Sequence, residues 1–355
     1  MKQFHPLTIE RIERETRDSV RIALRVPEEF EGEYEFLPGQ HLPFAITIDG
    51  KKLRRTYSIC SGVDERPLEI GVRVQPGGAF SEYAASTLSV GDTLDAMPPG
   101  GRFRIDLDKA NARDYIGFAA GSGITPILSI IKSVLDYEPG SRFVLFYGNR
   151  KQTTTMFIED LYALKNRYPE RLQLQFVFSQ EDQEFPIAAG RLDADKVREL
   201  YAHFCKGLDS AAAFVCGPDT MIRTVTDTLV ELGFDPDSVH AERFGVPRKG
   251  EAKIAAAGKA ADHASITVIM DGHKKAFEMR RDDENIVDAA AEHGIELPYS
   301  CKGGVCATCR CHVREGEVTM AANYGLEPWE IKAGFVLACQ SRPVSESVLL
   351  DYDKT

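Results

Sequence analysis

Residues 301–311 read CKGGVCATCRC and hold four of the eight cysteines of this 355-residue chain. Cys301, Cys306 and Cys309 follow the spacing C-x4-C-x2-C, and Cys339 comes after a further 29 residues. This spacing is typical of the plant-type [2Fe–2S] site, in which four thiolates hold two irons. We therefore predict that Cys301, Cys306, Cys309 and Cys339 bind such a cluster.

Two other interpretations of these cysteines are a zinc site and a set of packed, buried thiols. Zinc sites more often contain paired C-x2-C units, and here only one such unit is present. Gly303 and Gly304 favour the cluster, because they let the loop curl with its backbone N–H groups pointing inward. Cys311 is expected to be a packed thiol, since four thiolates already fill the site.

The first part of the chain, residues 1–106, reads as short strands separated by turn signals. In SVRIALRV (19–26) the apolar residues alternate, which is typical of a half-buried strand. Further strands are expected at 41–48, 53–59 and 68–74, with Pro-Gly and Asp-Gly turns between them. This pattern predicts an antiparallel β-barrel.

Residues 107–245 alternate between strands and helices, which predicts an α/β domain with a mostly parallel sheet. Residues 246–264 are rich in Ala, Lys and Gly, and we interpret them as a linker that lets the last domain reorient. Residues 265–355 contain two strands, a helix and then the cysteine loop. They are expected to form a compact α+β domain.

Composition excludes several function classes. Asp and Glu number 54 against 43 Lys and Arg, giving a net charge of −11, and no local basic stripe suggests nucleic-acid binding. The longest uncharged run, 115–131, is too short and too broken to span a membrane. MKQFHPLTIERIERE (1–15) has no apolar signal region, so we expect a cytoplasmic protein. Neither H-E-x-x-H nor G-x-S-x-G occurs, so hydrolase chemistry has no support.

Two motifs of the first domain suggest a flavin site. Arg55, Tyr57 and Ser58 lie in RTYS, where the arginine suits a phosphate, the ring suits stacking on a flavin and the hydroxyl suits its reactive edge. GGAFS (77–81) leads into a helix start, which can hold a pyrophosphate. RTYS alone also fits a surface arginine beside a tyrosine of the barrel, and GGAFS alone also fits an ordinary turn. The two motifs in this order favour a flavin site more than either does alone.

Three motifs of the second domain suggest a dinucleotide. GSGITP (121–126) joins the first strand of that domain to its first helix, where open parallel sheets bind dinucleotides. CGP (216–218) forms a similar turn later, so Cys216 could lie against a nicotinamide or could be a buried small residue. Asn149 and Arg150 end a strand where an adenosine ribose is expected, and the arginine favours the 2′-phosphate of NADPH over NADH.

Together with PGQ (38–40), ERF (242–244) and the cysteines, these motifs identify a resemblance. The chain resembles the ferredoxin–NADP reductase-like flavoproteins that carry a C-terminal plant-type ferredoxin domain. Within that family it is most similar to the reductase subunits of phenylacetyl-CoA epoxidase systems, on FYGNR (146–150), LKNRYPERLQL (164–174), FSQE (178–181) and the cysteine loop.

The resemblance implies an FAD-binding barrel, a nucleotide-binding α/β domain and a β-grasp ferredoxin domain. It places Ser58 and Cys216 in catalysis. It implies cofactor binding by Arg55, Tyr57, Ser58, Gly78, Ser81, Gly121, Gly123, Thr125, Cys216 and Gly217. Asn149, Arg150 and Phe244 are further residues that we expect to bind a cofactor.

These parts predict an electron path from NAD(P)H through FAD and the cluster to an external oxygenase component. A nicotinamide releases two electrons together and the cluster accepts one, so a flavin belongs between them. The predicted partner is the di-iron phenylacetyl-CoA epoxidase, and the isolated protein is expected to be a monomer. The alternatives are a reductase for a Rieske-type or other monooxygenase, and a redox-sensing interaction protein.

Overall fold

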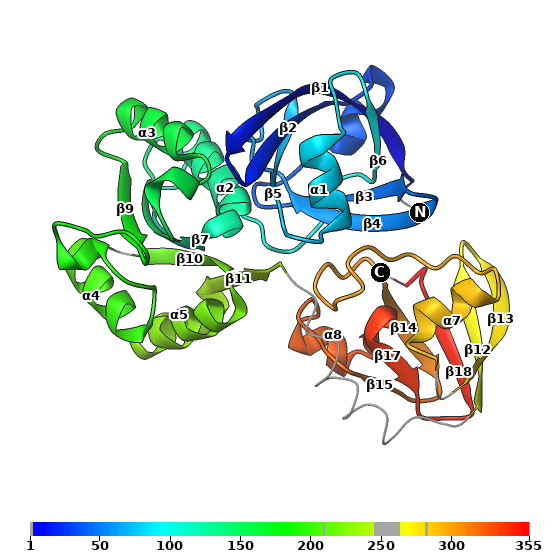
Figure 1. Ribbon diagram of the computed structural model, residues 1–355. Helices are drawn as coiled ribbons and strands as arrows, with labels where there is room; N and C mark the ends of the chain where they lie inside the picture. The colour runs from blue at the N-terminus through cyan, green and yellow to red at the C-terminus, as the bar shows by residue number, and fades with distance from the viewer. Residues whose placement is uncertain (1–2, 209, 245–262, 281–282, 355) are drawn as a thin grey trace. The chain divides into compact units, whose positions relative to one another are not determined.

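The computed structural model describes residues 3–208, 210–244, 263–280 and 283–354, which contain four β-sheets (Figure 1). Most of residues 3–244 form one compact unit, and the described residues from His263 onward make up most of a second. The predicted linker, 246–264, lies outside the described residues except for its last two positions. Its proposed role as a tether therefore stays a prediction.

The first sheet is antiparallel and six-stranded, in the order β4-β3-β6-β1-β2-β5. An antiparallel bridge between Ile59 and Ile70 joins the chain just after edge strand β4 to edge strand β5, and so closes the sheet. This is the antiparallel barrel that the strand and turn pattern predicted. Its elements are β1 (His5–Thr16), β2 (Ser19–Arg25), β3 (His41–Ile48), β4 (Lys51–Ser58), β5 (Leu68–Arg73), α1 (Ala79–Ser86) and β6 (Thr93–Ala96).

The second sheet is parallel and five-stranded, in the order β11-β10-β7-β8-β9. The chain enters at the central strand β7, builds outward to β9, and then crosses to β10 on the other side. The strand order therefore reverses between β7 and β10, the position at which open α/β sheets bind ligands. The strands are β7 (Asp114–Ala120), β8 (Arg142–Asn149), β9 (Leu172–Phe178), β10 (Ser210–Gly217) and β11 (Val239–Arg243).

Two pairs of helices supply the two apolar layers that enclose this parallel sheet. Ile127 and Ile130 of α2 and Leu161 of α3 belong to one core, and Val197 of α4 and Val225 of α5 belong to the other. Strand β7 is almost wholly buried because it has apolar neighbours on both faces. The helices are α2 (Ile124–Tyr137), α3 (Ile158–Arg167), α4 (Ala194–Phe204) and α5 (Asp219–Glu231).

The second unit contains a mixed five-stranded sheet, β13-β12-β18-β14-β16, and a two-stranded sheet, β15-β17. Strands β12 and β18 pair in parallel, and helix α7 packs against β13. Its elements are β12 (His263–Met270), β13 (His273–Arg280), α7 (Ile286–Glu292), β14 (Arg310–Glu315), β15 (Val318–Met320), α8 (Pro328–Lys332), β16 (Phe335–Leu337), β17 (Ser341–Pro343) and β18 (Ser347–Asp351). This is the predicted compact α+β domain.

Short 3₁₀ helices connect several of these elements. They are η1 (Glu28–Tyr34), η2 (Gly121–Gly123), η3 (Gln152–Thr154), η4 (Pro186–Ala188), η5 (Pro236–Ser238) and η6 (Ala338–Gln340). Two of them, η2 and η6, fall on predicted binding motifs. The regular helix α2 follows η2 directly, so the glycine turn and the helix form one continuous segment.

Candidate redox centre and nucleotide cleft

Strand pairing brings the four predicted cluster ligands together. Cys301, Cys306 and Cys309 lie in the loop that leads into β14, and Cys339 lies in η6, directly after β16. Strands β14 and β16 pair antiparallel, and the N–H of Ala338 donates to the carbonyl of Cys309 at 3.1 Å. The fourth cysteine is thus fixed beside the third across 29 residues of sequence.

The four thiols form two pairs. Cys301 and Cys306 share a hydrogen bond, and so do Cys309 and Cys339. The first pair is partly exposed, whereas Cys309 and Cys339 are buried. Among the described residues no three His, Cys, Asp or Glu side chains converge on a single ion. In a [2Fe–2S] site two thiolates hold each of the two irons, and two pairs of thiols fit that requirement.

One member of each pair is disposed to be a thiolate. The Cys306 thiol, with the backbone N–H groups of Cys306 and Gly303, lowers the pKa of Cys301 to about 5. Those N–H groups lie 3.4 and 3.3 Å from the Cys301 sulfur. The Cys309 thiol likewise lowers the pKa of Cys339. Thiolates are the metal-binding form of cysteine, and the partner thiols Cys306 and Cys309 have raised pKa values, so each pair shares one proton more readily than two.

Cys311, which is also in this region, has a different environment. It is fully buried in the core of the second unit, and burial raises its pKa to about 12. A thiol held in its protonated form among apolar neighbours fits the predicted packing role.

Gln340 is a residue of this site that sequence reasoning missed. Its side-chain amide Nε2 donates to the Lys302 carbonyl at 2.9 Å and to the Cys339 sulfur at 3.7 Å. The amide therefore links the loop of the first three cysteines to the fourth, and it points a donor at a ligand sulfur. Only its position directly after Cys339 could have indicated this.

Replacing this donor by an apolar side chain of similar size, in Gln340→Leu, should make the cluster harder to reduce. Hydrogen bonds to ligand sulfurs stabilise the reduced, more negative state, so their loss lowers the reduction potential. We expect a decrease of tens of millivolts, where about 60 mV corresponds to tenfold in a one-electron equilibrium. A redox titration followed by electron paramagnetic resonance measures it. An unchanged potential in a variant that keeps its cluster would contradict this role.

The predicted flavin residues lie at the end of β4. Ser58 is buried, Tyr57 is half-buried with its ring centroid 5.1 Å from that of Phe80, and Arg55 is exposed. Phe80 belongs to α1, which begins within GGAFS, so the start of this helix packs beside the tyrosine. This proximity joins the two motifs predicted for FAD, although their individual roles stay predictions.

Gly78 and Ser81 shape that helix start. The Ser81 hydroxyl accepts from the N–H of Gln75 at 3.0 Å and donates to the carbonyl of Gly78 at 3.1 Å. A Cβ on Gly78 would lie 2.5 Å from the Ser81 oxygen. Glycine is therefore required for the turn that presents the first N–H groups of α1, the kind of turn that can hold a phosphate.

A buried carboxylate, also missed from the sequence, lies beside Ser58. The Ser58 hydroxyl donates to Glu242 Oε2 at 3.4 Å, and His41 Nδ1 lies 3.5 Å from Glu242 Oε1. Burial, and then the charge of Glu242, raise the pKa of Cys216 well above its ordinary value. The serine, the histidine and the carboxylate come from three separate strands, and the hydrogen bond to Glu242 orients the Ser58 hydroxyl.

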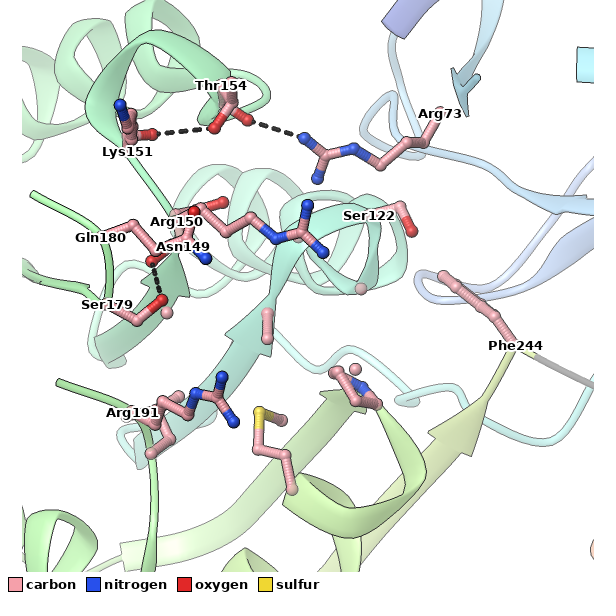
Figure 2. A pocket seen from close by; sticks show the side chains of 18 of the residues that line it. Arg73, Ser122, Asn149, Arg150, Lys151, Thr154, Ser179, Gln180, Arg191 and Phe244 are labelled. Carbon is pink, nitrogen blue, oxygen red and sulfur yellow. Dashed lines mark hydrogen bonds between the residues drawn. The ribbon is translucent and has the colours of Figure 1, made fainter. Parts of the chain in front are cut away.

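A cleft of about 1070 Å³ runs along the carboxyl ends of the parallel strands (Figure 2). Its walls come from the end of β5 in the barrel and from the turns that follow β7, β8, β9 and β10. It thus lies at the reversal of strand order. Six of the predicted residues line it: Gly121, Gly123, Asn149, Arg150, Gly217 and Phe244.

Thr125 and Cys216 do not line the cleft. The Thr125 hydroxyl is buried and donates to the Ser122 carbonyl at 3.0 Å, inside the turn. Cys216 is fully buried behind Gly123, where a Cβ would lie 2.1 Å from the Cys216 carbonyl oxygen. The GSGITP and CGP turns therefore touch through backbone atoms, and only glycine allows that approach.

The cleft is rich in positive charge although the chain is acidic. Arg150 and Arg191 project their guanidinium groups into it, and within the described residues neither side chain has an ion-pair partner (Figure 2). Asp18 and Asp193 also line it, but Asp18 pairs with Arg73 at 3.2 Å, and Asp193 accepts the backbone N–H of Lys196, the third residue of α4. The cleft is therefore suited to several phosphates. Its cationic side chains are Arg17, Arg73, Arg150, Lys151 and Arg191.

None of the helices in the described part of the chain is long and apolar enough to cross a membrane.

Three domain families match the chain. An oxidoreductase FAD-binding domain matches residues 6–105, an oxidoreductase NAD-binding domain matches residues 118–227, and a 2Fe-2S iron-sulfur cluster binding domain matches residues 268–344. The first match covers nearly all of the barrel, the second covers β8, β9, β10 and the end of β7 in the parallel sheet, and the third covers the four paired cysteines.

Similar proteins of about the same length are known. The chain is 42% identical to one of the subunits of 1,2-phenylacetyl-CoA epoxidase from Escherichia coli, over 99% of each chain. It is 34% identical to the ferredoxin reductase component of 3-ketosteroid-9-alpha-monooxygenase from Rhodococcus rhodochrous, over 98% of this chain and 96% of the relative. Among solved structures, phthalate dioxygenase reductase superposes with a TM-score of 0.61 at 25% identity, over 98% of each chain.

Proposed function

Because the chain belongs to the family of oxygenase reductases with FAD-binding, NAD-binding and [2Fe–2S] domains, we propose that it passes electrons from NADPH to a phenylacetyl-CoA epoxidase. The observation that carries the choice of partner is the 42% identity to the E. coli epoxidase protein over nearly the full length of both chains. The reductase for the steroid monooxygenase is less similar, at 34%.

The residues of the chain would act at three sites, which bind the nucleotide, the flavin and the cluster. Nicotinamide, flavin and cluster, when bound, supply hydride transfer, the change from two electrons to one, and single-electron delivery. Arg150 and Arg191 would bind the nucleotide phosphates in the cleft. Ser58, oriented by the buried Glu242, would hold a proton at the reactive edge of the flavin. The two thiol pairs would bind the irons.

The preference for NADPH rests on the charge of the cleft around Arg150. Arginine suits the additional 2′-phosphate because its planar guanidinium matches phosphate oxygens. Arg191 also lines the cleft and projects into it. Glu181, the first acidic residue after β9, accepts the Gln152 N–H at 2.7 Å and does not line the cleft. The two acidic residues that line the cleft already have partners, since Asp18 pairs with Arg73 and Asp193 accepts the N–H of Lys196.

The proposed function is tested with the purified full chain, NADPH and the purified oxygenase component of a phenylacetyl-CoA epoxidase. We expect consumption of phenylacetyl-CoA that depends on both proteins and on NADPH. The oxygenase component of a 3-ketosteroid 9-alpha-monooxygenase serves as the comparison. Faster electron delivery to that second component, or none to the first, would assign the reductase to another oxygenase. A redox-sensing protein would show no turnover with either one.

Electron delivery to the partner should slow as ionic strength rises. Residues 265–355 hold 15 Asp and Glu against 10 Lys and Arg, so a basic docking face on the partner would be attracted. Salt screens such attraction beyond about 10 Å at 0.1 M. Stopped-flow reduction of the oxygenase component at low and at high salt measures the effect. A rate that does not change between the two would mean that the acidic charge serves solubility alone.

A further inference from the structure

The second unit exposes three large apolar side chains that lie close together in sequence. In the described part of residues 263–354, three large apolar side chains are exposed, namely Tyr324 at 44%, Trp329 at 60% and Ile331 at 46%. All three fall within eight residues of sequence, and Trp329 is the only tryptophan of the chain. Trp329 and Ile331 lie on α8, on either side of the buried Glu330. We call these three residues the α8 surface.

The α8 surface is attached to the cluster loop at two points. The N–H of Tyr324 donates to the carbonyl of Gly304 at 3.0 Å, so the first of the three residues rests on the loop itself. At the other point, Glu330 forms an ion pair with Arg310 at 3.2 Å, and Arg310 directly follows Cys309. A molecule seated on this surface would therefore lie beside the segments that carry three of the four thiols.

The surface is also held rigidly. Glu327 and Glu330 form a capping box at the start of α8, and Asn323 hydrogen-bonds in both directions with the backbone of Leu326. The Trp329 and Phe335 rings pack edge to face with their centroids 6.4 Å apart, and this contact fixes the orientation of the indole. An exposed indole fixed in this way loses little conformational freedom on binding, and Trp is enriched at the energetic centres of interfaces.

We propose that the α8 surface is the docking site for the oxygenase component that accepts electrons from the cluster. The proposal rests on the function proposed above, which requires a protein acceptor at this cluster. Electrons leave most directly through the partly exposed Cys301–Cys306 side, and the loop of that pair is the one on which Tyr324 rests. The unit is acidic, so the matching face is an apolar pocket for Trp329 with lysine and arginine around it.

Two substitutions in the full chain test the proposal. Trp329→Ala removes the anchor, and Ile331→Glu places a charge on α8 two residues away without removing the Trp329–Phe335 contact. Each should raise the KM for the purified epoxidase oxygenase component about tenfold or more, as expected when a central aromatic residue of an interface is lost. Reduction of the cluster by NADPH, followed by stopped-flow absorbance without the oxygenase, should be unchanged. Phe185→Ala, which removes a 64% exposed aromatic side chain from the first unit, is the matched control.

A second measurement leaves the sequence unaltered. Incorporation of 5-fluorotryptophan labels Trp329 alone, and its single ¹⁹F resonance should shift or broaden when the oxidised oxygenase component is added.

An unperturbed resonance, or a KM equal to that of the wild type in both variants, would overturn the proposal. Slower cluster reduction in the variants would assign the surface to the protein's own flavin unit, and a concentration-dependent change in mass would assign it to a second copy. If the wild-type chain delivers no electrons to the epoxidase, the proposed function itself fails, a result distinct from any of these.

Discussion

Cys309→Ser should abolish electron delivery to the oxygenase while leaving the flavin half of the protein intact. Cys309 is buried and hydrogen-bonded to Cys339, so its loss leaves one of the two irons with a single thiol. A serine hydroxyl is far harder to deprotonate than a thiol and is a poor ligand for iron. The barrel and the parallel sheet have their own cores, which share no residue with the core around the cysteines. FAD content and the bleaching of FAD by NADPH should therefore match the wild type.

The measurement compares iron content, FAD content and two rates in the same preparation. Iron should fall from two atoms per chain to nearly none, and oxygenase-coupled turnover should fall below detection. Cys311→Ser, two residues further along, is the matched control, because this buried thiol belongs to neither pair and the variant should keep its iron. Loss of FAD in Cys309→Ser would contradict the independence of the two halves. Retention of the cluster would contradict the ligand assignment.

The second large effect concerns the choice of nucleotide. Arg150→Ala and Arg191→Ala should each raise the KM for NADPH about tenfold or more, with little change in the KM for NADH. A hydrogen bond to a charged group contributes about 1.5–3 kcal/mol, which corresponds to roughly 10- to 150-fold in affinity. Neither guanidinium has an ion-pair partner in the described part of the chain, so its removal leaves no carboxylate unpaired. The loss should therefore report phosphate binding rather than damage to the fold.

Steady-state kinetics with both nucleotides separate the possibilities. Arg25→Ala, at the end of strand β2 and outside the cleft, provides an exposed arginine as a control. If both arginines bind the same phosphate, the double variant should lose less than the product of the single effects. Inhibition by 2′,5′-ADP, which needs no turnover, should weaken in parallel. Equal losses for NADPH and NADH would place these arginines at the pyrophosphate instead of the 2′-phosphate.

Motifs contained within one stretch of sequence were predictable. The cysteine spacing grouped the four thiols, and the structure brings Cys339 to Cys309 through the β14–β16 pairing. The change from period-two apolar alternation to strand-helix alternation predicted an antiparallel barrel followed by a parallel sheet, and both are present. These inferences succeed because spacing along the chain and periodicity of burial are local consequences of backbone geometry.

Residues whose roles arise from contacts between distant segments were not predictable. Glu242 reaches Ser58 only because the end of β11 lies beside the end of β4, 184 positions away in sequence. Arg191 reaches the cleft from the loop before α4, and nothing in that loop marks it as a binding motif. Gln340 and Glu330 likewise become informative only when the segments after β14 fold back on the cysteine loop. A single sequence shows which residues are present but not which residues lie next to them in the folded protein.

The positive charge of the cleft predicts that the product NADP⁺ inhibits the reductase. NADP⁺ carries the same phosphates as NADPH, so the arginines attract the spent nucleotide about as strongly as the fresh one. The two nucleotides differ only in the nicotinamide ring, and we propose that Arg150 and Arg191, which project into the cleft, bind the phosphates that both share. We therefore expect competitive product inhibition, so that oxygenation slows as NADP⁺ accumulates and resumes when the NADPH pool is restored. Electron delivery to the oxygenase would then stop before the cell has used up its NADPH.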